Sequence, residues 1–358
     1  MAENHVLIVV DMQEDFVTGA LGSAAAEAIV PYVNEKIAWH VNGGRGPLIF
    51  TKDTHGADYL ETQEGRNLPV PHCVKGTAGW EVVEPLRGWE ASQCRVFEKP
   101  AFGSAVLAET LAEENKKEAI TSITLTGLCT DICVISNAMV LKAFLPEVPV
   151  AVDLLCCAGV SRESAATALA AMRACQIETH METPRLLLRP WRAADAEACF
   201  KYAGNPVIGS SCGWPVHKDV ADSQEVIRTA LSAPETYAVV LKETGEPVGS
   251  IGLLTGEAVH TAARVDGEGE IGFWVGEPYW GQGLIPEAVQ YAFLRHCFEN
   301  VGLDALWCGY FEGNAKSQRV QEKCGFRYHH TEEDKLCVPI GELRTTHFTY
   351  LSREDWDK

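Results

Sequence analysis

Apolar runs alternate with amphipathic stretches through the first half of the chain, and this alternation limits the fold more than any other feature. The runs expected to be strands are His5–Asp11, Pro47–Asp53, Ser122–Leu128, Val148–Leu155 and Gln176–His180. The stretches expected to be helices are Ser23–His40, Ser104–Glu114, Ile132–Leu145 and Ser161–Cys175. Continuous apolar strands separated by amphipathic helices indicate a parallel sheet with helices on both faces. The first half is therefore predicted to be a three-layer α/β/α domain.

A different pattern follows the short polar break Met181-Glu182-Thr183-Pro184. A helix is expected from about Asp195 and another at Leu284–Glu299, with strands at Tyr237–Lys242, Pro247–Leu254 and Glu270–Val275 and a hairpin turn at Gly245. A chain of 358 residues is too long for one ordinary domain. We therefore predict two domains, residues 1–182 and 183–358.

Composition excludes several classes of function. A net charge of −19 disfavours nucleic acid as a partner, because such binding depends on Lys and Arg neutralising phosphates. No stretch approaches the roughly 20 apolar residues of a membrane span. The N-terminus lacks a basic region and is expected to be a strand, not a signal peptide. Thirteen scattered cysteines without a CxxC pair predict a reduced, cytoplasmic protein.

Reactive side chains follow several of the predicted strands, at the edge of a parallel sheet where ligand sites gather. They are Asp11, Asp53 with His55 and His72, Lys99, and the cysteines of Thr126–Val134. A cysteine at a helix N-terminus can have a lowered pKa, and an Asp-x-His pair with a further His can bind Zn²⁺, Fe²⁺ or Mn²⁺. Each feature alone has a plainer explanation, namely a strand-end acid, surface histidines, a snorkelling lysine or a buried thiol.

Together and in this order, these segments resemble the isochorismatase-like cysteine hydrolases over about residues 5–180. The resemblance implies an amide-hydrolysing triad of Asp11, Lys99 and Cys133. Cys133 is preferred to Cys129 as the nucleophile, since family sequences contain Gly-x-x-Thr-Asp-x-Cys. The family also implies a non-proline cis peptide between Leu128 and Cys129, and an oxyanion hole formed by the backbone N–H groups of Cys129 and Cys133.

The Asp53-x-His55…His72 segment resembles the nicotinamidase branch in particular. It implies a divalent metal, Zn²⁺ or alternatively Fe²⁺ or Mn²⁺, that binds a pyridine nitrogen. A further ligand would be Glu61 or Glu64, of which Glu64 is favoured. The expected substrate is a small carboxamide, with nicotinamide first. Another amide or an isochorismate-like vinyl ether are the alternatives, although the ether chemistry needs no metal.

In the second half, Glu270–Val275 is followed by Trp280-Gly281-Gln282-Gly283, and later by Asn314, Ser317 and Gly325-Phe326. Glycines between a strand and a helix let backbone N–H groups reach a pyrophosphate. These segments resemble the GNAT superfamily over about residues 184–356, specifically the branch with ribosomal-protein N-terminal acetyltransferases. The resemblance implies an α+β fold with a mixed, largely antiparallel sheet, and acetyl-CoA as co-substrate.

By this resemblance, acetyl-CoA lies where the strand ending at Val275 splays from its neighbour. The implied contacts are Phe273, Trp274 and Val275 to pantetheine, Trp280, Gly281, Gln282 and Gly283 to pyrophosphate, and Asn314 and Ser317 near the thiol. Ser317 is a candidate proton donor, and Glu270 is a candidate base or simply a solvated acid. The sequence departs from the family at Pro278, where a basic residue or Gln is usual.

We therefore predict a bifunctional enzyme, an amidohydrolase joined to an N-acyltransferase. The acceptor amine would be a small molecule or a peptide N-terminus, and Trp214 and His217 could shape its pocket or simply pack. The alternative for the second half is an acyl-CoA-binding sensor or scaffold. Assembly into a homo-oligomer is left open.

Overall fold

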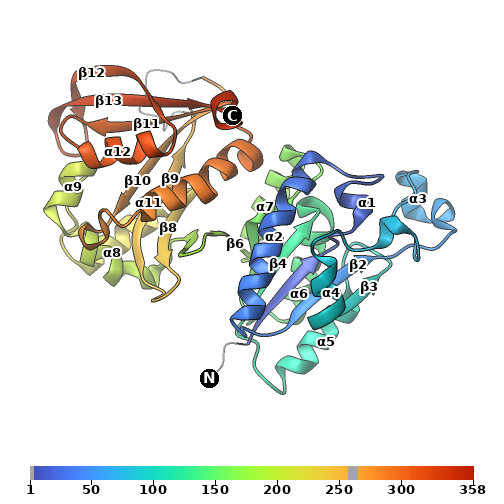
Figure 1. Ribbon diagram of the computed structural model, residues 1–358. Coiled ribbons are helices and arrows are strands. Elements are labelled where there is room, and N and C mark those ends of the chain that lie inside the picture. Colours follow the sequence, from blue (N-terminus) through green and yellow to red (C-terminus); the bar gives the residue numbers. More distant parts are fainter. Residues whose placement is uncertain (1–3, 257–264) are drawn as a thin grey trace. The chain divides into compact units, whose positions relative to one another are not determined.

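The computed structural model describes residues 4–256 and 265–358. The chain divides into two compact units, Met1–His180 and Met181–Lys358, and each is described by itself. Figure 1 shows both units coloured along the sequence. None of the helices in the described ranges combines the length and the apolar character needed to span a membrane.

A parallel sheet forms the centre of the first unit. Its strands are β1 (His5–Val10), β2 (Leu48–Asp53), β3 (Arg95–Lys99), β4 (Ser122–Leu128), β5 (Val150–Ala158) and the beginning of β6 (Glu178–Glu182). They lie in the order β3-β2-β1-β4-β5-β6, and every neighbouring pair is parallel. The carboxyl ends of β1 to β4 therefore lie side by side at one edge of the sheet.

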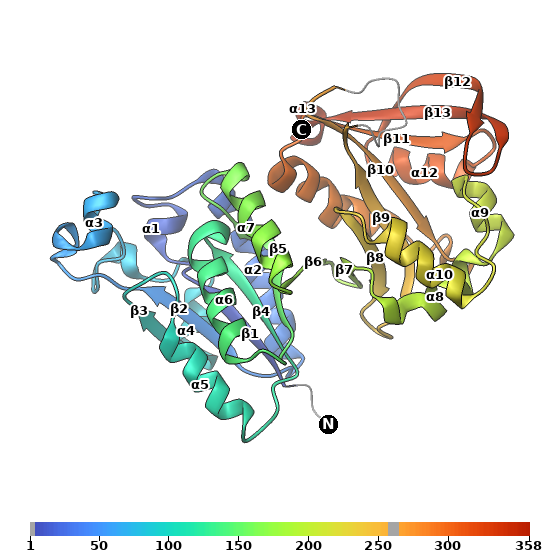
Figure 2. The same cartoon turned by 180° about the vertical axis from the view of Figure 1, so that it is seen from behind.

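Helices cover both faces of this sheet, as Figures 1 and 2 show from opposite sides. They are α1 (Glu14–Val17), α2 (Ala24–Asn42), α3 (Gln63–Asn67), α4 (Arg87–Gln93), α5 (Ala105–Asn115), α6 (Ile135–Phe144) and α7 (Arg162–Ala174), with short helical turns at Tyr59–Glu61, Ala78–Trp80 and Thr130–Val134. Five consecutive residues of β1, Val6 to Val10, are completely buried, which requires cover on both faces. The prediction of a three-layer α/β/α fold is confirmed.

One strand of this sheet was not among those expected from the sequence. The expected strands have counterparts in β1, β2, β4, β5 and β6, but Arg95–Lys99 was not assigned to the sheet. This segment is the edge strand β3, and its alternating exposure hides the apolar signal of a buried parallel strand. Its last residue, Lys99, is only 1% exposed, so the snorkelling explanation for that lysine is wrong.

The second unit contains a mixed sheet that is mostly antiparallel. Its strands are β7 (Leu186–Pro190), β8 (Thr236–Leu241), β9 (Pro247–Leu254), β10 (Glu268–Val275), β11 (Ala305–Phe311), β12 (Arg327–Cys337) and β13 (Glu342–Ser352), in the order β7-β8-β9-β10-β11-β13-β12. Among these seven described strands, only the β10–β11 pair is parallel. The predicted α+β fold is confirmed.

Strands β10 and β11 separate part of the way along their length. Their ladder joins Glu268, Gly269 and Glu270 to β11 and goes no further. From Ile271 to Val275, β10 remains paired with β9 on its other side, while β11 continues alongside β13. Among the residues described, the backbone of β10 beyond Glu270 therefore has a sheet neighbour on one side only, in line with the expectation that the strand ending at Val275 splays from its neighbour.

Helices flank this second sheet as well. They are α8 (Ala196–Ala203), α9 (Pro206–Cys212), α10 (Val220–Val226), α11 (Leu284–Glu287), α12 (Ala315–Lys323) and α13 (Arg353–Trp356), and helical turns at Ala288–Phe293 and His296–Val301 prolong α11. On one face, Ala238 and Val240 pack with residues of α8. On the other, the neighbouring Tyr237 packs against Phe293. Both faces therefore contribute to the core.

Candidate active sites

Three of the residues singled out in the first unit meet at the carboxyl edge of its sheet. Asp11 follows β1, Asp53 ends β2 and Lys99 ends β3. Asp53 and Lys99 are direct partners in the β2–β3 register. Because these strands are parallel neighbours, side chains that are far apart in the sequence converge at one place.

A buried ammonium group lies at the centre of this convergence. Lys99 Nζ is 2.7 Å from Asp11 Oδ2, 3.2 Å from Asp53 Oδ1 and 3.5 Å from Cys133 Sγ. Asp11 is also fixed by Thr51, whose hydroxyl donates a hydrogen bond of 2.7 Å to Oδ1. The structure therefore brings the three residues of the expected triad, Asp11, Lys99 and Cys133, into one buried cluster.

Burial and mutual charge shift the pKa values in this cluster. Burial raises the pKa of Asp11, an effect that Lys99 opposes and Asp53 reinforces. Burial also raises the pKa of Cys133 well above its usual value, and the charge of Asp11 adds to this. Burial disfavours the charged form of Lys99, yet Asp11, Cys133 and Asp53 together raise its pKa. Lys99 therefore stays protonated, and the groups that can exchange a proton are Asp11 and Cys133.

Cys133 belongs to a single turn of wide helix, η3 (Thr130–Val134), that leads directly into α6. The expected cis peptide between Leu128 and Cys129 is present just before this turn. Asn137 donates hydrogen bonds to the carbonyl groups of Cys133 and Phe102, which ties the turn to the loop after β3. The expected lowering of the thiol pKa by the helix N-terminus does not prevail, because burial and the charge of Asp11 raise it.

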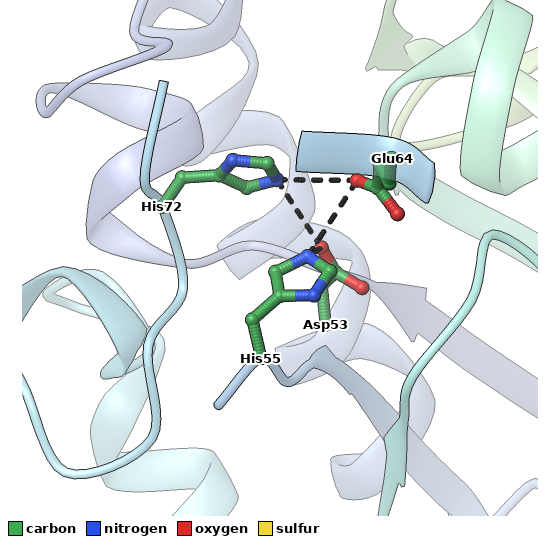
Figure 3. A group of neighbouring side chains, drawn as sticks. All are labelled: Asp53, His55, Glu64 and His72. Carbon is green, nitrogen blue, oxygen red and sulfur yellow. Dashed lines mark hydrogen bonds and ion pairs between the residues drawn. The ribbon is translucent and has the colours of Figure 1, made fainter. Parts of the chain in front are cut away.

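A second cluster lies beside the first, and Figure 3 shows its four side chains converging. Asp53, His55, Glu64 and His72 each offer one donor atom, all within 4.8 Å of one another. Of the two glutamates considered for this group, Glu64 on α3 is the one that joins it. Asp53, His55 and His72 are buried, and the Glu64 side chain is 21% exposed.

The separations between these donor atoms suit a divalent ion. His55 Nε2 lies 2.9 Å from Asp53 Oδ2 and 3.6 Å from Glu64 Oε1. His72 Nε2 lies 3.5 Å from Asp53 Oδ2 and 3.6 Å from Glu64 Oε1. Ligands at about 2.1 Å from an ion are about 3.0 Å apart at right angles and about 3.4 Å apart in a tetrahedron. Two imidazoles and two carboxylates therefore fit Zn²⁺, Fe²⁺ or Mn²⁺ in geometry and in donor type.

The two clusters share Asp53. Its Oδ2 faces His55 and His72, and its Oδ1 receives a hydrogen bond from Lys99. Burial disfavours its charged form, but hydrogen bonds from the two histidines and the charge of Lys99 lower its pKa overall. Asp53 is therefore ionised and links the nitrogen donors to the lysine.

Supporting residues that the sequence analysis missed hold these groups in position. The buried side chain of Gln13 accepts a hydrogen bond of 2.7 Å from the Asp53 backbone N–H and donates to the carbonyls of Asp53 and Trp80. His72 Nδ1 lies 2.8 Å from the Val70 carbonyl oxygen, an arrangement that directs Nε2 toward Asp53 and Glu64. Gln13 lies two residues after Asp11, but its hydrogen bonds go to backbone groups, which no sequence motif marks.

In the second unit, the expected cofactor residues lie along the separated part of β10 and the turn after it. Phe273, Trp274 and Val275 are in the segment that pairs with β9 and with no other strand described. The turn Trp280–Gly283 follows, and the Trp280 indole N–H donates to the Val275 carbonyl. Gly281 and Gly283 have φ of 77° and 76°, conformations that L side chains rarely adopt.

The remaining residues expected at the cofactor lie at the start of α12 and at Glu270, the last position of β10 that pairs with β11. Asn314 caps α12 by accepting a hydrogen bond from the Ser317 backbone N–H, and the Ser317 hydroxyl accepts one from Gln321. Glu270 is buried, so the explanation as a solvated acid is wrong. Trp214 packs on Trp274.

His217 is buried and its Nδ1 lies 2.8 Å from the Ser223 hydroxyl oxygen. Burial lowers its pKa. Among the residues described, His217 therefore has the surroundings of a packed histidine.

Known proteins match each half of the chain. Residues 5–182 match the isochorismatase domain family and residues 185–327 the acetyltransferase (GNAT) domain family. Nicotinamidase 1 of Arabidopsis thaliana is 30% identical, over 36% of this chain and 56% of that protein. Uncharacterized N-acetyltransferase p20 of Bacillus licheniformis is 26% identical, over 40% of this chain and 80% of that protein. Among solved structures, pyrazinamidase of Pyrococcus horikoshii in complex with zinc is 27% identical and covers 50% of this chain and 99% of its own, with a TM-score of 0.44.

A hydrolase domain is thus followed by an acyltransferase domain in one polypeptide. The first is an isochorismatase domain with nicotinamidase-like relatives, and the second is a GNAT acetyltransferase domain. Both resemblances predicted from the sequence are confirmed.

The hydrogen bond between the Asp53 backbone N–H and the Gln13 side chain gives a testable prediction. Replacing Gln13 with Ala leaves the buried Asp53 N–H without its acceptor, and we expect a loss of about 1–3 kcal/mol in the free energy of unfolding of the first unit. Urea unfolding followed by circular dichroism measures it. Gln63→Ala, at an exposed position of α3, is the control and should stay within about 0.5 kcal/mol of wild type. Equal stability of the two variants would contradict the supporting role of Gln13.

Proposed function

We propose that the first domain hydrolyses a small carboxamide through Cys133, with Asp11 as the base and Lys99 as the stabilising cation. The observation that supports this most directly is the buried Lys99 ammonium lying within 3.5 Å of both the Asp11 carboxylate and the Cys133 sulfur. A thiol in these surroundings ionises only if a nearby base takes its proton. Asp11, whose pKa is raised by burial and whose side chain hydrogen-bonds with Cys133, is the acceptor we propose.

The proposed reaction has two halves. The Cys133 proton passes to Asp11, and the thiolate, beside Lys99, attacks the carboxamide carbon. Backbone N–H groups of Cys129 and Cys133 would receive the oxyanion that forms. The C–N bond then breaks, and the nitrogen takes the proton from Asp11 and leaves as ammonia. Water, activated by the freed Asp11 carboxylate, hydrolyses the thioester and restores the thiol.

Asp53, His55, His72 and Glu64 are proposed to hold one divalent ion beside this group. The observation behind the proposal is the agreement of their four donor separations with ligand spacing around such an ion. When bound, the ion supplies a Lewis acid that can take a ring nitrogen of the substrate. Asp53 contacts both His55 and Lys99, so the ion site and the Cys133 cluster are adjacent. A substrate whose ring nitrogen is held at the ion site would therefore have its carboxamide near Cys133.

Nicotinamide is the substrate we propose, with nicotinate and ammonia as products. It carries a ring nitrogen for the second cluster and a carboxamide for the first. The similarity to a protein named as a nicotinamidase supports the same choice. Another small heteroaromatic amide is the alternative, because any ring that carries both a nitrogen and a carboxamide could meet the two clusters in the same way.

For the second domain we propose transfer of an acetyl group from acetyl-CoA to an amine. The support is the separation of β10 from β11 beyond Glu270, followed by the open turn at Gly281 and Gly283. The backbone groups of Phe273–Val275 that face away from β9 would pair with the pantetheine amides, and the turn would receive the diphosphate. Ser317 would protonate the departing thiolate, and Glu270 would take the proton of the amine.

Replacement of the proposed nucleophile gives the first test. Cys133→Ala should lower ammonia release from nicotinamide by about four orders of magnitude or more, because the covalent route is lost. Cys129→Ala, which keeps the backbone N–H, is the matched control and should retain activity within about tenfold. Undiminished ammonia release by the Cys133 variant would refute the assignment.

Metal content gives the second test. Elemental analysis of the purified protein should find one divalent ion per chain, and a chelator should remove it together with amidase activity. His72→Ala should weaken metal binding at least about tenfold, the loss that even an outer partner of a ligand can cause. His329→Ala, at an exposed histidine of the second domain, should bind metal normally. Full activity without a stoichiometric ion would favour a metal-free reaction.

Acetyl-CoA binding tests the second domain. Isothermal titration should detect binding to the full chain, and Gly281→Val or Gly283→Val should weaken it about tenfold or more by blocking the diphosphate and disfavouring the positive φ. Gly245→Val is the matched control, since Gly245 has a φ of 71° in a different turn. Wild-type protein that binds no acetyl-CoA would exclude the acetyltransferase, and binding without transfer to any amine would favour a sensor.

A further inference from the structure

The turn that is proposed to receive the diphosphate carries no positive charge of its own. Between Gly276 and Gly283 the chain has one acid, Glu277, and no Lys or Arg, and Pro278 stands where the family usually has a basic residue or Gln. The whole chain is also strongly acidic, with a net charge of −19. A polyanionic cofactor would therefore meet unfavourable electrostatics unless cations are brought to the turn from elsewhere.

Arg185, just before β7, is one such cation. Its Nε donates to Glu287 Oε2 at 2.6 Å, and its Nη1 donates to the Gln282 carbonyl at 3.1 Å, inside the turn itself. Its Nη2 lies 3.8 Å from the position that a Cβ on Gly283 would take. Nη2 has no hydrogen-bond partner among residues 4–256 and 265–358. Two further donors of this guanidinium are thus available beside Gly283.

Glu287 fixes this arrangement. Besides the Arg185 side chain, it accepts hydrogen bonds from the Arg185 backbone N–H at 2.9 Å and from the Thr183 hydroxyl. The side chain of Arg185 is 49% exposed, yet it is held at two of its three nitrogens. A guanidinium that is oriented before binding loses less conformational entropy when a ligand arrives.

Lys316, on the first turn of α12, is the second cation. Its Nζ lies 3.4 Å from the centre of the Trp280 ring, a cation–π contact with the residue that opens the turn. Lys316 and Arg185 come from segments far apart in the sequence, and both contact residues of Trp280–Gly283. Neither is among the residues that the sequence analysis assigned to the cofactor.

We propose that Arg185 and Lys316 together bind the diphosphate of acetyl-CoA over the Gly281–Gly283 turn, and so supply the charge that is absent at Pro278. This inference rests on the proposed acetyltransferase function. The planar guanidinium can offer parallel N–H donors to phosphate oxygens, and the ammonium adds a compact charge beside Trp280. Both residues are binding residues; neither takes part in the transfer step.

Titration of the full-length protein with acetyl-CoA tests the proposal. Arg185→Gln and Lys316→Gln should each raise the dissociation constant about tenfold or more, the usual effect of losing a charge-assisted hydrogen bond. Arg228→Gln is the matched control, because Arg228 is also an exposed arginine paired with a glutamate in this domain, on the turn Ile227–Leu231. It should bind as wild type does. Arg185→Lys, which keeps the charge and loses the fork, should fall between wild type and Arg185→Gln.

A second ligand separates the two phosphate groups of the cofactor. Acetyl-dephospho-CoA lacks the 3′-phosphate and keeps the diphosphate, so the loss caused by each variant should be the same with both ligands. A loss that disappears with acetyl-dephospho-CoA would overturn the diphosphate assignment. Thermal melting of each variant detects a merely structural role, since a lower melting temperature with unchanged affinity would also overturn it. Absence of binding by wild type would instead refute the proposed function.

Discussion

The geometry of the first domain depends on one buried charge, the ammonium group of Lys99. An ammonium ion so far from water is tolerated only when anions surround it, and Asp11 and Asp53 supply them at 2.7 and 3.2 Å. Meeting this requirement fixes the ends of β1, β2 and β3 relative to one another. The same contacts bring the sulfur of Cys133 within 3.5 Å of the cation. The same set of distances therefore neutralises the buried lysine and arranges the side chains of the candidate site.

The sequence predicted most of this edge because strand ends in a parallel sheet can be located from apolar periodicity. Asp11, Asp53 and Cys133 each adjoin a run that is unmistakably apolar. Lys99 lies in an edge strand with alternating exposure, so its burial could not be deduced from its neighbours. Gln13 was missed for a different reason: its contribution is to the backbone of Asp53, and such pairing leaves no pattern in the sequence.

In the second domain, the sequence indicated the turn and the helix after it, since glycines mark both. The sequence did not indicate which residues from other segments lie beside the turn. Arg185 and Lys316 approach from segments outside the motif, and only the folded sheet shows that they meet at the same four residues. A substitution inside a motif, such as Pro278, is thus an incomplete guide to the charge of a site. The surrounding elements decide whether that charge is restored.

The four-residue cluster of Asp53, His55, Glu64 and His72 is assembled from two sources that can change independently. Asp53 belongs to the end of a core strand, whereas Glu64 and His72 come from the long segment between β2 and β3. The side chains of Asp11, Lys99 and Cys133 themselves lie outside that segment. Insertions or replacements there would change the residues of the four-residue cluster without replacing the side chains of Asp11, Lys99 or Cys133. Under the proposed function, variation in that segment would change which ligand is bound more readily than it would change the reaction.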